Sequence, residues 1–190
     1  MKRGTRALGV AESFGPDAER STLCGAVVRA DRVVDGFAYE TCRVGGTDAT
    51  EAIRSLFREL GREDVRHLLV AGVAPAWYNL VDLHTLHEVV GIPVLSVSFE
   101  ESEGLEDALA REFDGEALAR RLDTYRAQPP RRPVDVGDDR VFVRAVGCDD
   151  ETAARVVSAH TPEGSGRPEP LRVARLAARA ADDLRRTHDA

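Results

Sequence analysis

The sequence has almost no lysine: Lys2 is the only one, and arginine supplies the other 25 of its 26 basic residues. With abundant Ala, Asp and Glu, this composition suggests a GC-rich genome or a salt-rich cytoplasm. No apolar run approaches the ~20 residues that a membrane-spanning helix needs. The first residues, MKRGTRALGV, lack the long apolar core and the cleavage site of a signal peptide. These absences predict a cytoplasmic protein without a membrane segment.

Paired cysteines are missing as well. Cys24, Cys42 and Cys148 show no paired spacing, and three is an odd number. Free and mostly buried thiols in a reducing cytosol are therefore expected. His84 and His87 lie three residues apart, but no third ligand is identifiable and the spacing fits no zinc-protease motif, so we predict no zinc site there.

The composition is that of a globular protein. The 190 residues are 43% hydrophobic and 31% charged, which suits one domain, or one domain with a small appendage, around a real core. The net charge of −7 argues against a broad nucleic-acid footprint. It leaves room for a local basic strip.

The order of predicted elements indicates the fold class. Alternating, β-branched and helical patterns predict strands at 6–11, 22–29 and 33–43, a helix at 49–60, a strand at 67–71, a helix at 81–90, a strand at 94–98 and a helix at 105–113. A three-strand meander followed by β-α-β-α predicts an α/β protein with a mixed five-stranded sheet of ribonuclease H-like architecture. The first strand should then lie between the second strand and the strand at 67–71.

The remaining third of the chain is predicted to extend this core. Residues 1–127 form the core, and residues 128–139, which begin with Gln-Pro-Pro-Arg-Arg-Pro, form a stiff linker that cannot join a sheet interior. Residues 140–190 form a strand-helix-helix extension packed on the core. Pro170, at a first helical position, opens its last helix.

The last helix carries two stripes. An apolar stripe, predicted to be its packed face, comprises Val173, Leu176, Ala177, Ala180 and Leu184. A basic stripe comprises Arg172, Arg175, Arg179 and Arg186. The basic stripe is either a solvated face paired with Asp182 and Asp183, or a surface for phosphate groups, which suit the planar guanidinium.

Two predicted central strands end in alanine, at Ala11 and Ala71. In the predicted sheet these positions are neighbours at the C-terminal ends of adjacent strands, where open α/β sheets bind ligands. Two divalent ions that clamp a phosphodiester need several carboxylate oxygens at such a place, and alanine supplies none.

Six segments together resemble the endonuclease dU family, which is largely archaeal and related to endonuclease V. In chain order they are LGVAESF, VDGF, GTDATEAI, LVAGVAPAWYNLVDL, GIPVLSVS and RPEPLRVARLAAR. The resemblance covers most of the chain and implies a ribonuclease H-like fold. It also implies Mg²⁺- or Mn²⁺-dependent cleavage of DNA that contains deoxyuridine or another altered base, as in DNA repair.

The departures from the family pattern concern its acids. Where the family reads LGIDDG, residues 8–13 have Ala11 at the first acid and Glu12 at the second. Where it reads LDGITFGGFNVVD, residues 70–82 have Ala71 at the strand-end acid, while Asn79 and Asp82 match. Asp48 matches the acid of a DGLDAT run. The resemblance therefore implies that Glu12, Asp48 and Asp82 are the remaining catalytic acids.

Simpler roles exist for each of these residues. Asp48, with Glu51 three residues on, has the pattern of a helix N-terminal capping box. Glu12 points away from Ala11 if the strand continues, because successive side chains alternate between faces.

The aromatic pair Trp77 and Tyr78, beside Asn79, forms the densest polar and aromatic cluster after a strand end. These side chains either stack on a flipped base or pack in the core at the start of a helix.

Three functional hypotheses follow. The first is a metal-dependent endonuclease with an altered metal site, whose ligand set the sequence does not identify. The second is a non-catalytic relative that binds DNA through Trp77, Tyr78, Asn79 and the Arg172, Arg175 and Arg179 stripe. The third is a protein-interaction module on the same fold, for which the sequence offers no positive signal.

Overall fold

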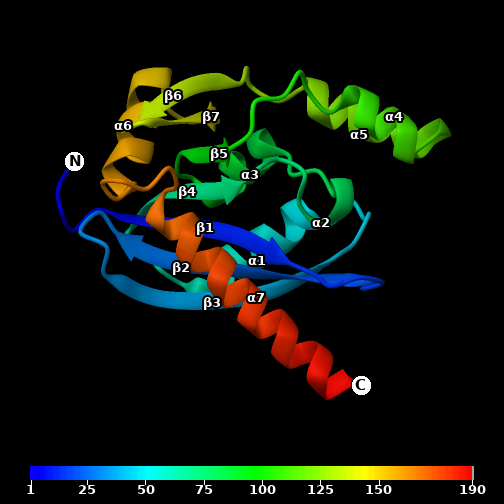
Figure 1. The fold of residues 1–190 in the computed structure, drawn as a ribbon, viewed down its shortest axis with the longest axis horizontal. Coiled ribbons are helices and arrows are strands. Elements are labelled where there is room, and N and C mark those ends of the chain that lie inside the picture. Colours follow the sequence, from blue (N-terminus) through cyan, green and yellow to red (C-terminus); the bar gives the residue numbers. More distant parts are fainter. Residues whose placement is uncertain (190) are drawn as a thin grey trace.

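One mixed sheet of seven strands runs through the protein, and helices cover both of its faces (Figure 1). The computed structural model describes residues 1–189. The strands are β1 (Arg6–Ser13), β2 (Arg20–Arg29), β3 (Val34–Arg43), β4 (Val65–Ala71), β5 (Val94–Ser98), β6 (Arg132–Val136) and β7 (Asp139–Val146). They are arranged in the order β3-β2-β1-β4-β5-β7-β6.

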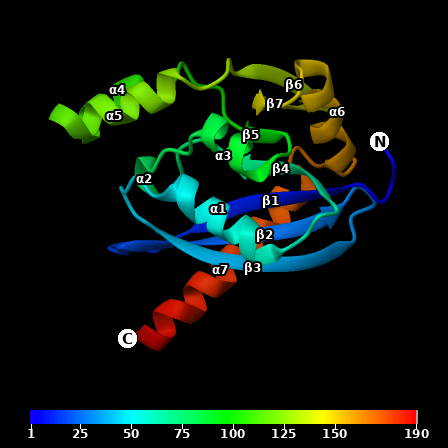
Figure 2. The same ribbon diagram turned by 180° about the vertical axis from the view of Figure 1, so that it is seen from behind.

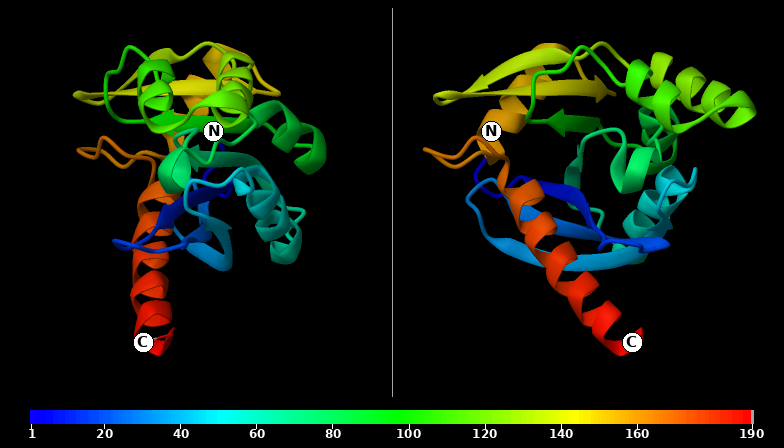
Figure 3. Two further views of the ribbon diagram at one scale, coloured as in Figure 1. Left: turned by 90° about the vertical axis from the view of Figure 1, so that its right-hand side faces the viewer. Right: turned by 45° about the vertical axis from the view of Figure 1, so that its right-hand side comes forward.

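The helices form a layer on each side of the sheet. They are α1 (Ala49–Leu60), the short turn α2 (Pro75–Tyr78), α3 (Leu83–Val90), α4 (Glu106–Glu112), α5 (Gly115–Arg126), α6 (Asp150–His160) and α7 (Glu169–Asp189). Helices α1 and α3 cover the face seen in Figure 2, and α7 crosses the opposite face, as the edge-on view in Figure 3 shows. Within residues 1–189, no helix is both long and apolar enough to cross a bilayer.

The predicted place of the first strand is confirmed. β1 pairs antiparallel with β2 and parallel with β4, and β4 pairs parallel with β5. The sheet has seven strands instead of five, because β7 pairs antiparallel with β5 and β6 with β7. The expectation that residues 128–139 form a linker was therefore wrong for part of its length. β6 accommodates Pro133 because it is an edge strand, where a missing N–H breaks no central ladder.

Alternation along β1 assigns its residues to two different layers. Leu8 and Val10 belong to the core shared with α1 and α3, whereas Ala7 packs in the core shared with α6. Ala11 packs toward α7. β1 continues to Ser13, so Glu12 is still part of the strand and lies on the face opposite to Ala11, as predicted.

The buried stripe of α7 differs from the predicted one. Leu176 and Leu184, which belonged to the predicted stripe, are 57% and 60% exposed. The residues that α7 buries are Pro170, Leu171, Ala174, Ala178 and Asp182. The prediction failed because it followed the large apolar side chains.

The reason for this difference is the short distance between α7 and the strands below it. A Cβ on Gly9 would lie 2.2 Å from the carbonyl carbon of Pro170. Farther along the helix, Ala11, Ala26 and Ala174 share one small apolar cluster. Only small side chains fit between backbones this close, so alanine and not leucine forms the packed face.

A buried carboxylate completes the contact between α7 and β2. Asp182 is 1% exposed and accepts a hydrogen bond from the Thr22 hydroxyl at 3.1 Å. Arg185 lies 3.1 Å from the same carboxylate oxygen. A buried charge is tolerated where hydrogen bonds and an opposite charge compensate it, and both are present here.

The three cysteines are free thiols, as predicted. Burial raises the pKa of the Cys24 thiol to about 11 and that of Cys42 to about 12. A thiol with so high a pKa is protonated at neutral pH and is a poor nucleophile. Cys24 and Cys42 are packing residues.

Two histidines lie inside the protein near one another. His160, at the end of α6, is fully buried, and its Nδ1 is 3.0 Å from the Val156 carbonyl oxygen. Burial, and then the charge of His160, lowers the pKa of His67 on β4 to about 4. Burial also lowers the pKa of His160. The folded protein therefore keeps both imidazoles neutral at pH values where an unfolded chain protonates them.

This difference predicts that stability falls as the pH drops from about 6.5, the value for an unperturbed histidine, toward about 4. In that window the unfolded chain binds more protons than the folded one, so protonation favours unfolding. The free energy of unfolding should change with pH by at most about 1.4 kcal/mol per pH unit for each histidine. Urea unfolding between pH 7 and 5, above the range of most carboxylates, measures it. His67→Leu should flatten the dependence, and the same change at exposed His84 should not.

Candidate functional site: an arginine groove at the strand ends

Ala11 and Ala71 lie close together in the middle of the sheet, as their strand order predicted. Ala11 is 3% exposed beneath α7, and Ala71 packs against the same small cluster from the end of β4. The methyl groups take up the space at the two central strand ends. Neither offers an oxygen to an ion or a substrate.

Glu12 does not replace the acid missing at Ala11. Its side chain lies on the face of α1, where Oε2 accepts a hydrogen bond of 2.6 Å from the Ser21 hydroxyl. The alternation of β1 keeps it on the opposite side of the sheet from α7.

Asp48 precedes α1, but the predicted capping box was wrong. The Asp48 carboxylate makes no capping bond to its helix and accepts instead from the Arg43 N–H at 3.0 Å and from Asn79 Nδ2 at 2.6 Å. Asn79 caps α1 in its place, because its Oδ1 accepts from the Ala49 N–H at 2.8 Å. Asn79 also donates to the Arg43 carbonyl and is fully buried. It joins two loops and is out of reach of a ligand.

Asp82 is the N-cap of α3. Its carboxylate accepts from the backbone N–H groups of His84 and Thr85 at 3.0 Å each, and from the Thr85 hydroxyl at 2.8 Å. Glu12, Asp48 and Asp82 are thus each committed to local hydrogen bonds. In the part of the chain that the structure describes, no three Asp, Glu, His or Cys side chains gather as a metal site would require.

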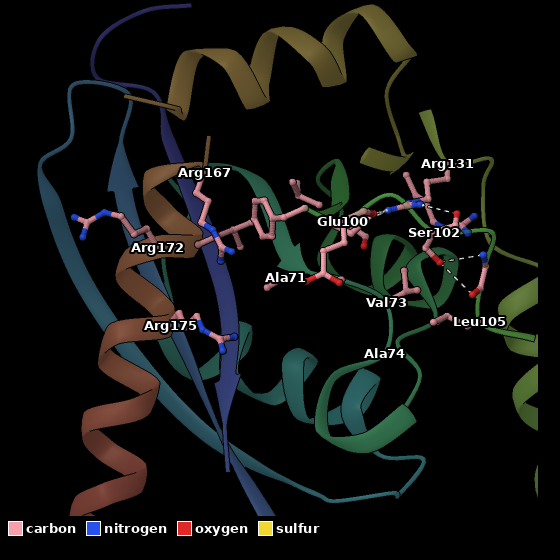
Figure 4. Close-up of a pocket in the computed structure, with 18 of the residues that line it drawn as sticks. Ala71, Val73, Ala74, Glu100, Ser102, Leu105, Arg131, Arg167, Arg172 and Arg175 are labelled. Carbon is pink, nitrogen blue, oxygen red and sulfur yellow. Dashed lines mark hydrogen bonds between the residues drawn. The ribbon is translucent and has the colours of Figure 1, made fainter. Parts of the chain in front are cut away.

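A large groove opens beside Ala71, between α7 and the C-terminal ends of β4 and β5 (Figure 4). Its volume is about 610 Å³. Six arginines line it: Arg131, Arg144, Arg167, Arg172, Arg175 and Arg179. We call it the arginine groove. On a chain with a net charge of −7, it gathers positive charge where open α/β sheets bind ligands.

One of these arginines, Arg131, holds the neighbouring loop. Arg131 donates to the Ser98 hydroxyl at 3.0 Å and to the Ser102 carbonyl at 3.1 Å, and its guanidinium stacks on Phe142. Burial, and then the nearby charge of Arg144, lowers the pKa of Arg131. Both guanidiniums line the groove, and neither makes an ion pair with a carboxylate among the described residues, so together they favour the binding of an anion.

The wall formed by α7 carries charges that are not neutralised. Arg172 pairs with Glu169 at 2.6 Å, and Arg186 pairs with Asp183 at 2.6 Å. Arg175 and Arg179 make no ion pair with any residue between 1 and 188. The basic stripe is therefore split: its two ends are paired with acids, and its middle faces the groove.

Glu100 is the single carboxylate among the described residues that line the arginine groove. It is exposed, and Figure 4 shows its side chain directed into the groove toward Ala71. Glu100, Arg131, Arg144 and Arg167 were not predicted as site residues. They come from separate loops and from β7, and only the folded chain brings them together.

The loop after β4 contains a strained turn. Ala76, Trp77 and Tyr78 have φ values of 47°, 57° and 59°, three left-handed residues in succession. This conformation costs a residue other than glycine roughly 1–2 kcal/mol. The related motif LDGITFGGFNVVD has glycine at the positions of Ala76 and Trp77, which is the signal that could have predicted the turn. Tyr78 points inward, whereas Trp77 is 51% exposed.

One mixed sheet with helices on both faces is an architecture shared with endonuclease V. The structure of endonuclease V from Ciona intestinalis, in complex with a 24mer DNA containing an inosine followed by a ribo-adenosine, has a TM-score of 0.67 with this protein. The alignment covers 96% of this chain and 87% of that one, at 15% sequence identity, and so shows a common fold.

The sequence comparisons identify the family. The family model of endonuclease dU matches residues 3–182, and this chain belongs to that family. A UPF0215 protein from Pyrobaculum calidifontis is 34% identical over 173 residues, which are 90% of this chain and 93% of that protein. A protein of unknown function from Archaeoglobus fulgidus has a TM-score of 0.81 at 25% identity, over 93% of this chain and 98% of that one.

Proposed function

We propose that this protein binds DNA containing deoxyuridine or another altered base, and that the arginine groove holds the phosphate backbone. The observation that carries the proposal is the pair of unneutralised arginines, Arg175 and Arg179, on a wall that faces the central strand ends. Guanidinium groups are well suited to phosphate oxygens. The choice of DNA rests on the family and on its likeness to endonuclease V.

The family also implies a divalent cation, Mg²⁺ or Mn²⁺. The side chains present do not fit a two-ion centre, because Ala11 and Ala71 have no oxygen and Glu12 faces the other layer. Asp48 accepts a hydrogen bond from Asn79, and Asp82 caps the N-terminus of α3. The proposed function is therefore binding, on a ribonuclease H-like frame, without cleavage through two ions.

Cleavage is the second candidate function, and Glu100 is the observation that favours it. As the one carboxylate directed into the arginine groove, it is the acid placed to serve a hydrolytic reaction there. Nicking of deoxyuridine-containing DNA, with Mg²⁺ or Mn²⁺ added, tests this candidate. Activity that is present in the wild type and lost in Glu100→Gln would establish it.

Binding itself is tested by the double change Arg175→Ala, Arg179→Ala. Fluorescence anisotropy with labelled DNA should show affinity reduced roughly tenfold or more. The slope of log K against log salt should fall by about 2, because each lost phosphate contact removes about 0.9.

A matched control removes two arginines elsewhere. Arg120 and Arg155 are exposed and pair with Glu116 and Glu151 on their own helices. The double change Arg120→Ala, Arg155→Ala alters the net charge equally and should leave affinity within twofold. Equal losses in the two double variants would mean that DNA is held by diffuse charge and not by the groove.

A further inference from the structure

The turn Pro75–Tyr78 is held in its left-handed form by a hydrogen bond from the next residue and by contacts from two other segments. The Gly45 N–H donates to the Ala76 carbonyl at 2.7 Å, and the Asn79 N–H donates to the Pro75 carbonyl at 2.9 Å. The Tyr78 ring packs edge-on against Phe113, with centroids 6.2 Å apart. The conformation is therefore imposed by its surroundings and does not follow from the preferences of its own residues.

A buried arginine connects these segments. Arg121 of α5 is 6% exposed, stacks on Phe113 at 3.8 Å and donates to the carbonyls of Tyr78 and Gly46 at 3.3 and 3.0 Å. Within the described chain, its hydrogen-bond acceptors are all backbone carbonyls, and it has no carboxylate partner. Burying a guanidinium in this way is costly, and its effect is to fix the turn beneath Trp77.

The side chain of Trp77, in the turn fixed by these contacts, is exposed to solvent. Half of it is exposed, and Tyr78 supports it edge-on at a centroid distance of 5.6 Å. Trp77 is the third residue after Ala74, which lines the arginine groove, so their backbones lie within about 11 Å of each other. The backbone of Trp77 therefore follows closely on the segment that lines the groove.

We propose that Trp77 is a base-stacking residue: it receives the face of a nucleotide base next to the segment whose phosphates lie in the arginine groove. This inference rests on the proposed function. A supported, rigid aromatic ring beside a basic track is the arrangement with which proteins hold single-stranded nucleic acid, since every base has a face to stack. A ring needed only for packing would be buried, and a turn needed only for its shape would be made by glycine without strain.

The experiment uses the fact that Trp77 is the only tryptophan in the chain. Single-stranded deoxyuridine-containing oligonucleotide is titrated into the protein while anisotropy of the labelled DNA and tryptophan emission are recorded together. Stacking predicts saturable quenching of the emission with the same midpoint as the anisotropy change. Binding without any change in emission would overturn the inference and leave the proposed function standing. If neither signal changes, both fail.

Variants supply the second test. Trp77→Gly should keep the fold, because glycine adopts a φ of 57° without strain. It should bind at least about fivefold more weakly. Trp77→Phe should restore most of the affinity. Phe37→Ala is the matched control, because Phe37 is 46% exposed on the outer strand β3, and it should bind as the wild type does. Wild-type affinity in Trp77→Gly would assign the ring to a protein contact and overturn the inference.

Discussion

Replacing Gly9 by alanine is expected to destabilise the protein by about 3 kcal/mol or more, at the upper end of the effects of overpacking. The new Cβ would lie 2.2 Å from the carbonyl carbon of Pro170 and 2.4 Å from its oxygen. These are backbone atoms at the start of α7, so no side chain can rotate out of the way. The helix has to lift from β1, and the arginine wall lifts with it.

Urea unfolding of Gly9→Ala measures the loss, and DNA anisotropy measures the displacement of the wall. Gly4→Ala is the control, because a Cβ there would have no atom within 4 Å. Its effect should stay within about 0.5 kcal/mol, as for other surface changes. A Gly9→Ala protein as stable as the control would show that α7 does not lie this close to the sheet.

The double change Ala11→Asp, Ala71→Asp is expected to create or strengthen metal-dependent nicking of deoxyuridine-containing DNA. It places two carboxylates at adjacent central strand ends, one beneath α7 and one in the arginine groove. Without an ion, the two charges repel each other, and the one at position 11 is buried. The variant should therefore be less stable than the wild type by several kcal/mol, with about 3–5 kcal/mol typical of an uncompensated buried charge.

Added Mn²⁺ or Mg²⁺ should restore that stability in a saturable way, because an ion that binds only the folded state raises the melting temperature by mass action. The single change Ala71→Asp is the control. Position 71 lies in the half-exposed groove, so this change should lower the free energy of unfolding only slightly. A double variant that folds and binds the ion but nicks nothing would show that more than these two acids has been lost.

The order of elements and the central strand arrangement were predictable from the sequence, because both depend on local periodicity and on short connections. The two extra strands were harder to place. Residues 141–146 look like a strand, but nothing local says that they pair with β5, which lies some forty residues earlier. β6 was missed because it contains Pro133, which is typical of a linker and is compatible with a strand only at the edge of a sheet.

The face of α7 was mispredicted for a similar reason. Hydrophobic periodicity measures side-chain size and polarity, and Leu176 and Leu184 dominate it. The helix is positioned by Gly9 on another element, through a contact that leaves room only for alanine. A packing distance between two segments far apart in sequence is not encoded in the pattern of either one.

The candidate site was predictable only in its location. The strand order placed Ala11 and Ala71 together, and the arginines of the last helix were recognised as candidates for phosphate contact. Asp48 and Asp82 carry the family pattern, but their hydrogen bonds to Asn79 and to α3 appear only in the folded protein. The same holds for Glu100, whose position in the groove depends on the loop that Arg131 secures.

The small apolar cluster beneath α7 also affects which substitutions the protein can accept. Once position 11 is alanine, the space around it closes into an apolar cluster with Ala26, Val28 and Ala174. Each later change that tightens this cluster raises the free-energy penalty for a carboxylate at position 11. A single change to an acid there is therefore disfavoured unless a bound ion or a second change on α7 relieves the penalty. The packing beneath α7 thus works against an acid at this strand end, independently of any selection on activity.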